Sequence, residues 1–357
     1  MSIELTPFLK DLLSLPGLSG YEGPARQRIS EAWQPLVDGL STSRMGSLHG
    51  YRRGTFAEQE NRPSILLATH MDAIGLMVTG VAAGGYLRVT QIGGVDPRIL
   101  PGQPVLVHSR KAALPGIAVL PVDRLLPANL AGKPAPLKYV LVDTGLPADE
   151  VAQQVRPGDL VSFAQQPLEL AGDIIAGHSL DNRASVAALT LCLQELQHMS
   201  PIWDVWAVAT VQEEETFGGA YTSPFEIRPS IAVAVDVTHA TGPGVSDYRG
   251  FALGKGLALG MGPNIHPAIH KSFVDLAKKL EIPHKVEAMA RHSGTDAFAM
   301  QVVAEGIPTM VVSIPLRYMH TPVEAVALKD IERTGHLLAE FIARLESDYI
   351  QTIHWDD

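Results

Sequence analysis

The chain has 357 residues, enough for about two domains at roughly 100–200 residues each. Its net charge of −10 argues against a nucleic-acid groove and against a surface that binds anionic membranes. Charged residues make up only 18%, below the ~25% that is usual for globular domains. We therefore expect large cores or surface that is buried between subunits.

Cysteine usage and the N-terminal segment give an expectation for the cellular compartment of the protein. Cys192 is the single cysteine, so no internal disulfide can form, and it lies in an apolar helical run that predicts a buried, inert thiol. The N-terminus lacks the basic and apolar segments of a signal peptide. No apolar run reaches the ~18 residues that a membrane span needs. These features favour a cytoplasmic protein.

The first predicted elements lead to a candidate metal ligand. Residues 6–15 and 23–36 have the apolar spacing of helices. The apolar run at 63–69 is typical of a strand that is buried on both faces of a parallel sheet. It ends at His70 and Asp72, an imidazole that can bind a metal and a carboxylate that can orient it. Taken alone, a histidine after a strand is more often a structural residue.

From residue 75 to about 164 the pattern changes to short strands between glycine and proline turns, with one helix near 148–155. Such strands indicate a small β-barrel or sandwich. We therefore expect a β domain at 75–164, inserted into an α/β domain made of 1–74 and 165–357. The strands are predicted at 76–79, 86–92, 104–108, 116–120, 138–143 and 159–163.

The α/β pattern resumes at Asp181, which precedes a predicted helix at 183–197. This aspartate is either an N-cap or a carboxylate that bridges two metal ions. The apolar run 203–211 predicts a buried strand, and it delivers Glu213, Glu214 and Glu215 to its end. Adjacent carboxylates raise one another's pKa unless a cation such as a divalent metal holds them. The alternative is a solvated turn, which we favour for Glu215.

Two further strands bring possible ligands to the same edge of the sheet. The run 231–235 is predicted to end at Asp236, level with His70. The run 309–314 is followed after a short segment by His320. Each residue taken singly has an ordinary structural explanation.

Together these residues form a set that a two-metal hydrolase needs. One carboxylate can bridge the two ions, and each ion takes one histidine and one further carboxylate. Nitrogen and oxygen ligands without a thiolate suit Zn²⁺, with Co²⁺ and Mn²⁺ as alternatives. The candidate ligands are His70, Asp181, Glu214, Asp236 and His320.

Six ordered motifs resemble the M42 family of metallo-aminopeptidases: residues 69–75, 180–183, 211–220, 234–238, 294–297 and 317–320. The resemblance covers nearly the whole chain. It implies a phosphorylase/hydrolase-like α/β sandwich as the catalytic domain, interrupted by a β-barrel-like dimerisation domain. It also implies two divalent metal ions per subunit, and dimers that assemble into a hollow tetrahedral dodecamer.

The resemblance further implies a role for each matching residue. Glu213 would be the general base, and Asp72 would support the metal site at His70. The substrates would be peptides with a free N-terminus, from which metal-activated water removes the first residue. The metal ligands would be His70 and Asp236 on one ion, Glu214 and His320 on the other, and Asp181 between them.

The chain departs from the family pattern at Ala73, Glu215 and Thr216, where members often have other residues. None of these is a candidate ligand, so the departures bear on substrate selection and metal affinity.

Another dinuclear amide hydrolase, a deacylase or carboxypeptidase, is the nearest alternative. A non-catalytic metal-binding assembly protein is a second one. A glycosidase fits less well, because it needs two carboxyls and no histidine.

Overall fold

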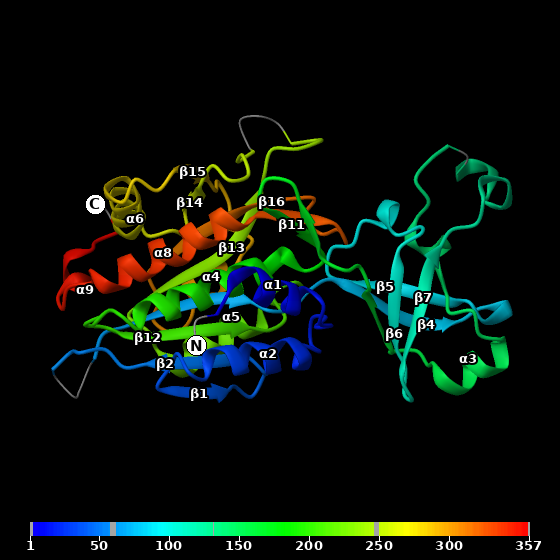
Figure 1. The fold of residues 1–357 in the computed structure, drawn as a ribbon, viewed down its shortest axis with the longest axis horizontal. Coiled ribbons are helices and arrows are strands. Elements are labelled where there is room, and N and C mark those ends of the chain that lie inside the picture. The colour runs from blue at the N-terminus through cyan, green and yellow to red at the C-terminus, as the bar shows by residue number, and fades with distance from the viewer. Residues whose placement is uncertain (1–2, 58–61, 131, 246–249, 356–357) are drawn as a thin grey trace.

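The structure is a computed structural model that describes residues 3–57, 62–130, 132–245 and 250–355. The extreme ends of the range expected for the catalytic domain, 1–2 and 356–357, lie outside the described residues. A large α/β lobe is joined to a smaller β lobe (Figure 1). Within the described ranges, no helix combines the length and the apolar character needed to cross a membrane.

The large lobe is built on a mixed sheet. Its order is β1-β2-β12-β3-β13-β16-β17-β11-β10, with β14 beside β16 and β15 beside β14. The neighbours β12, β3, β13 and β16 are parallel to one another, and most of their residues are buried, as expected for strands covered on both faces. The strands are β1 (Gly39–Thr42), β2 (Leu48–Arg52), β3 (Ser64–His70), β10 (Leu168–Leu170), β11 (Ile174–Gly177), β12 (Asp204–Thr210), β13 (Ile231–His239), β14 (Leu257–Met261), β15 (His284–Ala288), β16 (Thr309–Arg317) and β17 (Glu324–Ala327).

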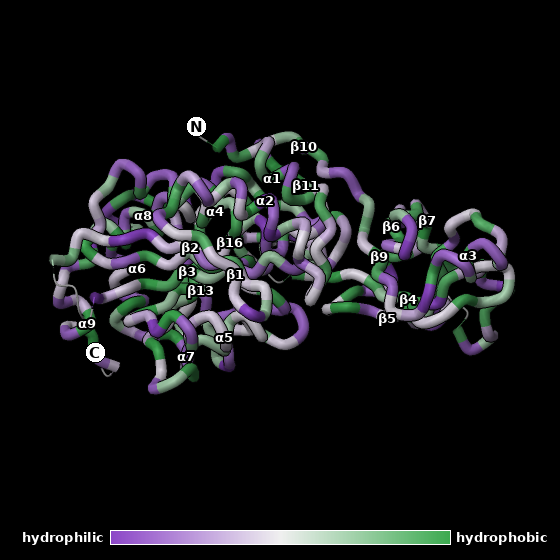
Figure 2. The backbone as a smooth tube through the Cα atoms, turned by 90° about the horizontal axis from the view of Figure 1, so that it is seen from below, coloured by the Kyte–Doolittle hydropathy of each residue, from purple (hydrophilic) through white to green (hydrophobic). Residues whose placement is uncertain are grey.

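Helices cover both faces of this sheet. In Figure 2, α1, α4 and α8 lie on one side, and α5 and α7 lie on the other. The helix α4 is buried almost all round because it is enclosed by the sheet, α1 and α8. The helices are α1 (Leu5–Leu13), α2 (Gly23–Trp33), α4 (Leu180–Leu196), α5 (Gly218–Ile227), α6 (Pro267–Lys279), α7 (Asp296–Gln301), α8 (Leu328–Ala343) and α9 (Tyr349–Thr352).

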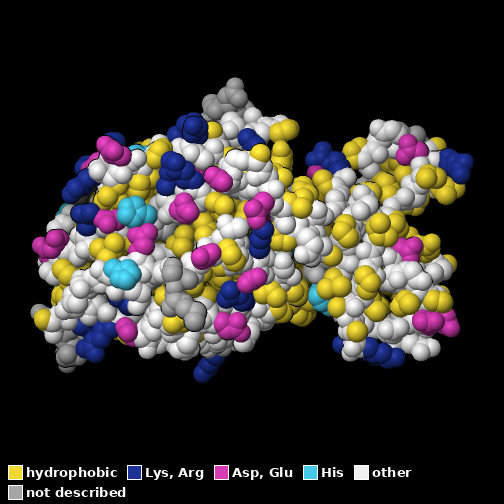
Figure 3. Space-filling model, in the orientation of Figure 1, with side chains coloured by type: hydrophobic (Ala, Val, Ile, Leu, Met, Phe, Trp, Pro, Cys, Tyr) yellow, Lys and Arg dark blue, Asp and Glu magenta, His cyan; other side chains and the backbone are white. Residues whose placement is uncertain are grey.

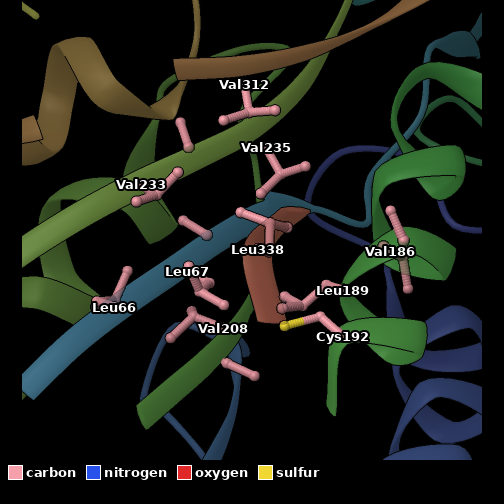
Figure 4. Close-up of a cluster of buried hydrophobic side chains, with 14 of the residues drawn as sticks. Leu66, Leu67, Val186, Leu189, Cys192, Val208, Val233, Val235, Val312 and Leu338 are labelled. Carbon is pink, nitrogen blue, oxygen red and sulfur yellow. The ribbon is translucent and has the colours of Figure 1, made fainter. Parts of the chain in front are cut away.

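The main core fills the space between the central strands and α4. Side chains such as Leu67 and Val208 from the sheet lie near Leu189 of α4 and Leu338 of α8 (Figure 4). Each such side chain stabilises the fold by about 1.5–3 kcal/mol when fully buried. Cys192 belongs to this core, and burial raises the pKa of its thiol, so the prediction of a buried thiol is confirmed.

The smaller lobe is a closed barrel with the strand order β4-β5-β8-β7-β6-β9. The predicted fold class is therefore confirmed. Of the two alternatives for residues 75–164, a barrel or a sandwich, the barrel is correct. Closure leaves no unpaired sheet edge. Leu76 of β4 pairs with Val161 of β9, which places the entry and the exit of this lobe side by side. Its elements are β4 (Gly75–Val81), β5 (Leu87–Ile92), β6 (Pro104–His108), β7 (Ala113–Val119), β8 (Leu141–Asp143), β9 (Leu160–Phe163) and α3 (Ala148–Gln154).

Two central strands run further than the sequence predicted. β13 continues to His239 and β16 to Arg317, because the two pair in parallel as far as His239 opposite Leu316. Backbone hydrogen bonding therefore continues past the point where the apolar runs stop. The prediction that the strand ends at Asp236 was wrong: this residue lies inside β13.

Candidate functional site

The candidate site lies where β3, β12 and β13 come together. Thr210 of β12 pairs with His70 at the end of β3. Ala234 of β13 pairs with Ala68 of β3, so Asp236 lies level with His70 two residues further on. The carboxyl ends of parallel strands are the usual place for ligands in open α/β sheets. Strand register thus brings His70 and Asp236 together although Asp236 is not at a strand end.

The chain turns sharply after β12. Gln212 has a φ of 59°, and the Thr216 N–H donates to the Gln212 carbonyl at 2.9 Å. The N–H groups of Glu213 and Glu214 donate to the two carboxylate oxygens of Asp72 at 3.0 and 3.1 Å. On a straight strand these glutamates would point to opposite faces. The turn, held by Asp72, directs both toward one site.

Asp181 lies at the centre of the site. One carboxylate oxygen is 3.1 Å from Nε2 of His70, and the other is 3.4 Å from Nε2 of His320. Its backbone is not helical although it lies in the first turn of α4, and Ser179 occupies the N-cap position. The side chain of Asp181 therefore faces two histidines from separate elements and does not cap the helix.

Three further carboxylates complete the cluster. Oε2 of Glu214 lies 3.4 Å from Nε2 of His320. Relative to Nε2 of His70, Oε2 of Glu213 lies at 3.7 Å and Oδ1 of Asp236 at 3.9 Å. Among the residues that the structure describes, three overlapping sets, each with ligand atoms within 4.8 Å of one another, could hold a metal ion: His70, Asp181 and Asp236; His70, Glu213 and Glu214; and Asp181, Glu214 and His320.

The His70 ring is oriented by its neighbours. Its Nδ1 lies 3.2 Å from the backbone carbonyl oxygen of Asp72, a partner to which a protonated Nδ1 donates. Nε2 then faces the carboxylates. In metal-binding histidines one ring nitrogen is typically held by a hydrogen bond of this kind, and the other nitrogen binds the ion. Burial disfavours the charged imidazole, but Glu213, Asp181 and Asp72 outweigh that effect and hold the pKa of His70 well above its usual value.

The site concentrates negative charge away from water. Burial raises the pKa of Glu213 and of Asp236 well above the ordinary range for carboxyls. Burial and the Asp181 charge raise the pKa of Glu214 to about 8. The hydrogen bond with Asp181 raises the pKa of His320 to about 9 in spite of partial burial. Such shifts mark a place that favours bound cations.

The smaller lobe contributes a wall of the site. The Gly93 N–H, in the loop after β5, donates to Oε1 of Glu215 at 2.6 Å. A Cβ on Gly94 would lie 2.6 Å from Nδ1 of His320, so this loop packs directly on the ring. Glu215 is exposed, yet it links the two lobes, a contact that the solvated-turn interpretation did not include.

The cluster opens into a cavity of about 390 Å³ that Phe217, Met289 and Met319 also line. This volume is within the range of small-molecule sites. Glu287 lines it too and accepts a hydrogen bond from the Thr238 hydroxyl. An apolar wall beside a charged cluster suits a ligand that carries a charged group next to an apolar one.

Sequence reasoning assigned no role to two buried carboxylates beside the cluster. Asp296, at the start of α7, accepts a hydrogen bond from the Thr210 hydroxyl at 2.6 Å, and burial raises its pKa to about 6. Glu324 of β17 accepts hydrogen bonds from the backbone of Asp181 and His320. A metal-ligand spacing rule does not find these two residues, because the fold and not the spacing of the sequence brings them beside the cluster.

Comparison with known proteins agrees with this geometry. The M42 glutamyl aminopeptidase family matches residues 50–337. A lysyl aminopeptidase from Pyrococcus furiosus is 34% identical over 343 residues, which span 95% of this chain and 96% of that protein.

Two solved structures have the same fold over nearly their full length. An aminopeptidase from the archaeon Desulfurococcus kamchatkensis has a TM-score of 0.88 and 34% identity, and the match covers 98% of this chain and 97% of the other. The TET1 peptidase of Pyrococcus horikoshii, described as assembling into a tetrahedron or a large octahedral shell, has a TM-score of 0.83 and 28% identity, covering 96% and 100%. Sequence, fold and relatives therefore agree that the chain belongs to the M42 glutamyl aminopeptidase family and is an aminopeptidase.

Proposed function

We propose that the chain is a dinuclear metal-dependent aminopeptidase in which Glu213 is the general base. The observation that carries this proposal is the position of Asp181, whose two oxygens face His70 and His320 separately at 3.1 and 3.4 Å. A carboxylate between two imidazoles, with further carboxylates around it, has the composition of a two-metal site.

The residues present fit two divalent cations. All donor atoms are carboxylate oxygens or imidazole nitrogens, a set that suits Zn²⁺, with Co²⁺ and Mn²⁺ as alternatives. Burial, together with repulsion from neighbouring carboxylates, raises the pKa of Glu213, Glu214 and Asp236, and bound cations would offset that effect. We assign His70 and Asp236 to one ion, Glu214 and His320 to the other, and Asp181 to both.

In this mechanism the two bound cations would lower the pKa of a water molecule and polarise the scissile carbonyl. Glu213, held by the bond from its N–H to Asp72, accepts the proton of that water. It then returns the proton to the leaving amine. Burial strengthens Glu213 as a base because it raises the pKa of the carboxyl. The negative site would also attract the free ammonium group of the substrate, which restricts cleavage to the first peptide bond.

We also propose that the barrel lobe mediates self-association. The catalytic domain is then 1–74 with 165–357, and the dimerisation domain is 75–164. On the smaller lobe, Val122 is 56% exposed and Leu125 is 71% exposed. Figure 3 shows hydrophobic side chains gathered over one face of this lobe. Exposed apolar patches of this kind often mark protein interfaces. The TET1 peptidase of Pyrococcus horikoshii, which can assemble into a tetrahedron or a large octahedral shell, supports assembly beyond a dimer. For this chain we propose a dodecamer.

The base assignment predicts the effect of Glu213→Gln. The variant should keep both metal ions but lose at least ~10²-fold in kcat, because only proton transfer is removed. Steady-state kinetics and metal analysis on the same sample would measure this. Glu226→Gln, the same charge change on the exposed face of α5, is the control and should keep normal kcat. Near-normal turnover by Glu213→Gln would refute the base assignment.

The substrate assignment predicts a requirement for a free N-terminus. Peptides with a free α-amine should release their first residue, and their N-acetylated forms should not. Mass spectrometry of the products would also reveal a deacylase, which removes the acetyl group, or a carboxypeptidase, which shortens the other end. Bound metal without any turnover would favour an assembly protein. Because relatives carry both glutamyl and lysyl names, acidic, basic and apolar first residues should all be tested.

The association proposal predicts that charges on the barrel lobe reduce oligomer size. The double variant Val122→Asp and Leu125→Asp should shift the protein to monomers in size-exclusion chromatography with light scattering, because burying a carboxylate at an interface is unfavourable. Val302→Asp places the same charge at a 61% exposed residue of the large lobe and should keep the dimer. A double variant with the wild-type mass distribution would exclude this surface as the dimer interface.

A further inference from the structure

Glu324 occupies an unusual position beside the candidate metal ligands. It begins β17, four residues after His320, and is only 1% exposed. Its Oε1 accepts a hydrogen bond from the His320 N–H at 2.9 Å, and its Oε2 accepts one from the Asp181 N–H at 3.1 Å. One buried side chain thus joins the backbone of two residues that come from different parts of the fold.

A carboxylate in this position is unfavourable unless its hydrogen bonds serve a purpose. Burial and the nearby Asp181 charge both disfavour the ionised form of Glu324. The two backbone donors and the nearby Arg183, a fully buried guanidinium, favour it. Both carboxylate oxygens are used on the backbone of candidate ligands, where a hydrophobic side chain of similar size could have packed.

Asp72 provides a second example of the same arrangement. It is also fully buried, and its two oxygens accept the N–H groups of Glu213 and Glu214. Two buried carboxylates therefore fix the backbone of four residues of the site, two each. The paired arrangement indicates a shared role in holding the ligand frame.

We propose that Glu324 is a positioning residue of the metal centre, which fixes Asp181 and His320 at the separation needed to share an ion. The role rests on the proposed function, because it presumes that these two residues bind metal. Glu324 acts through the backbone and does not itself contact the ion. Outer groups that orient metal ligands typically contribute about 10–100-fold to metal affinity.

The test compares Glu324→Gln with a matched control in the full-length protein. Glutamine keeps the size of the side chain, but its amide nitrogen cannot accept a hydrogen bond, so one of the two N–H groups loses its partner. The control is Asp330→Asn in α8. Asp330 is also fully buried and accepts two backbone N–H groups, from Gly254 and Gly256, which are not candidate ligands.

The measurement is Zn²⁺ affinity of the metal-free proteins, by competition with a chelator, together with their thermal unfolding in the absence of metal. We expect Glu324→Gln to bind Zn²⁺ about 10–100-fold more weakly than wild type. The Zn²⁺ affinity of Asp330→Asn should stay within about threefold of the wild-type value, although this variant should lose about as much thermal stability as Glu324→Gln. Glu324→Asp, which keeps the charge but withdraws the oxygens by one methylene, should also bind more weakly and serves if the glutamine variant does not fold.

Two results would overturn the role of Glu324 alone: wild-type Zn²⁺ affinity in both Glu324 variants, or an equal loss of affinity in Asp330→Asn, which would mean general loosening of the fold. A wild-type protein that binds no Zn²⁺ would overturn the metal centre itself, and this role with it. The failure of the proposed function is thereby distinguished from the failure of this inference.

Discussion

The main physical constraint on this structure is that several carboxylates lie close together in a site that is shielded from water. Asp181, Glu213, Glu214 and Asp236 come from three segments and meet in one largely buried cluster. Their mutual repulsion and the loss of hydration oppose the ionised state, which is why the pKa of Glu214 rises to about 8. Such a cluster is stable and useful only if cations and hydrogen-bond donors compensate it. The rest of the site can be understood as the means of that compensation.

The protein itself compensates two further carboxylates that support this cluster. Backbone N–H groups point at Asp72 and Glu324, and the buried Arg183 lies near both carboxylates. Arg183 is anchored in turn, because its Nη1 donates to the carbonyl oxygens of Leu12 in α1 and of Leu15 just after it. The N-terminal helix, the start of α4 and the turn after β12 are thus connected to one electrostatic centre. This connection explains why the site is formed by residues spread over most of the chain.

Sequence reasoning predicted most of the residues that the structure brings together here, and one supporting residue, Asp72, but not the other supports. His70, Asp181, Glu214, Asp236 and His320 were predicted as ligands because they follow apolar runs or begin a helix, and a parallel sheet aligns the ends of such runs. The end of β13 was misjudged, because hydrogen bonding to β16 extends the strand into polar sequence. Glu324 and the contact from Gly93 to Glu215 were missed for a different reason. The bond from the Asp181 N–H to Glu324 and the bond from the Gly93 N–H to Glu215 join segments that are distant in the sequence, and neither periodicity nor spacing in one sequence encodes such contacts.

The central claim is that two divalent cations, bridged by Asp181, balance the carboxylate cluster. Anomalous diffraction from crystals of the full chain loaded with Zn²⁺ tests it most directly, because it places each ion relative to each ligand. The account predicts two peaks about 3.5–4 Å apart, one on each side of the Asp181 carboxylate, with His70 beside one and His320 beside the other. A single peak, or two ions that do not share Asp181, would contradict it.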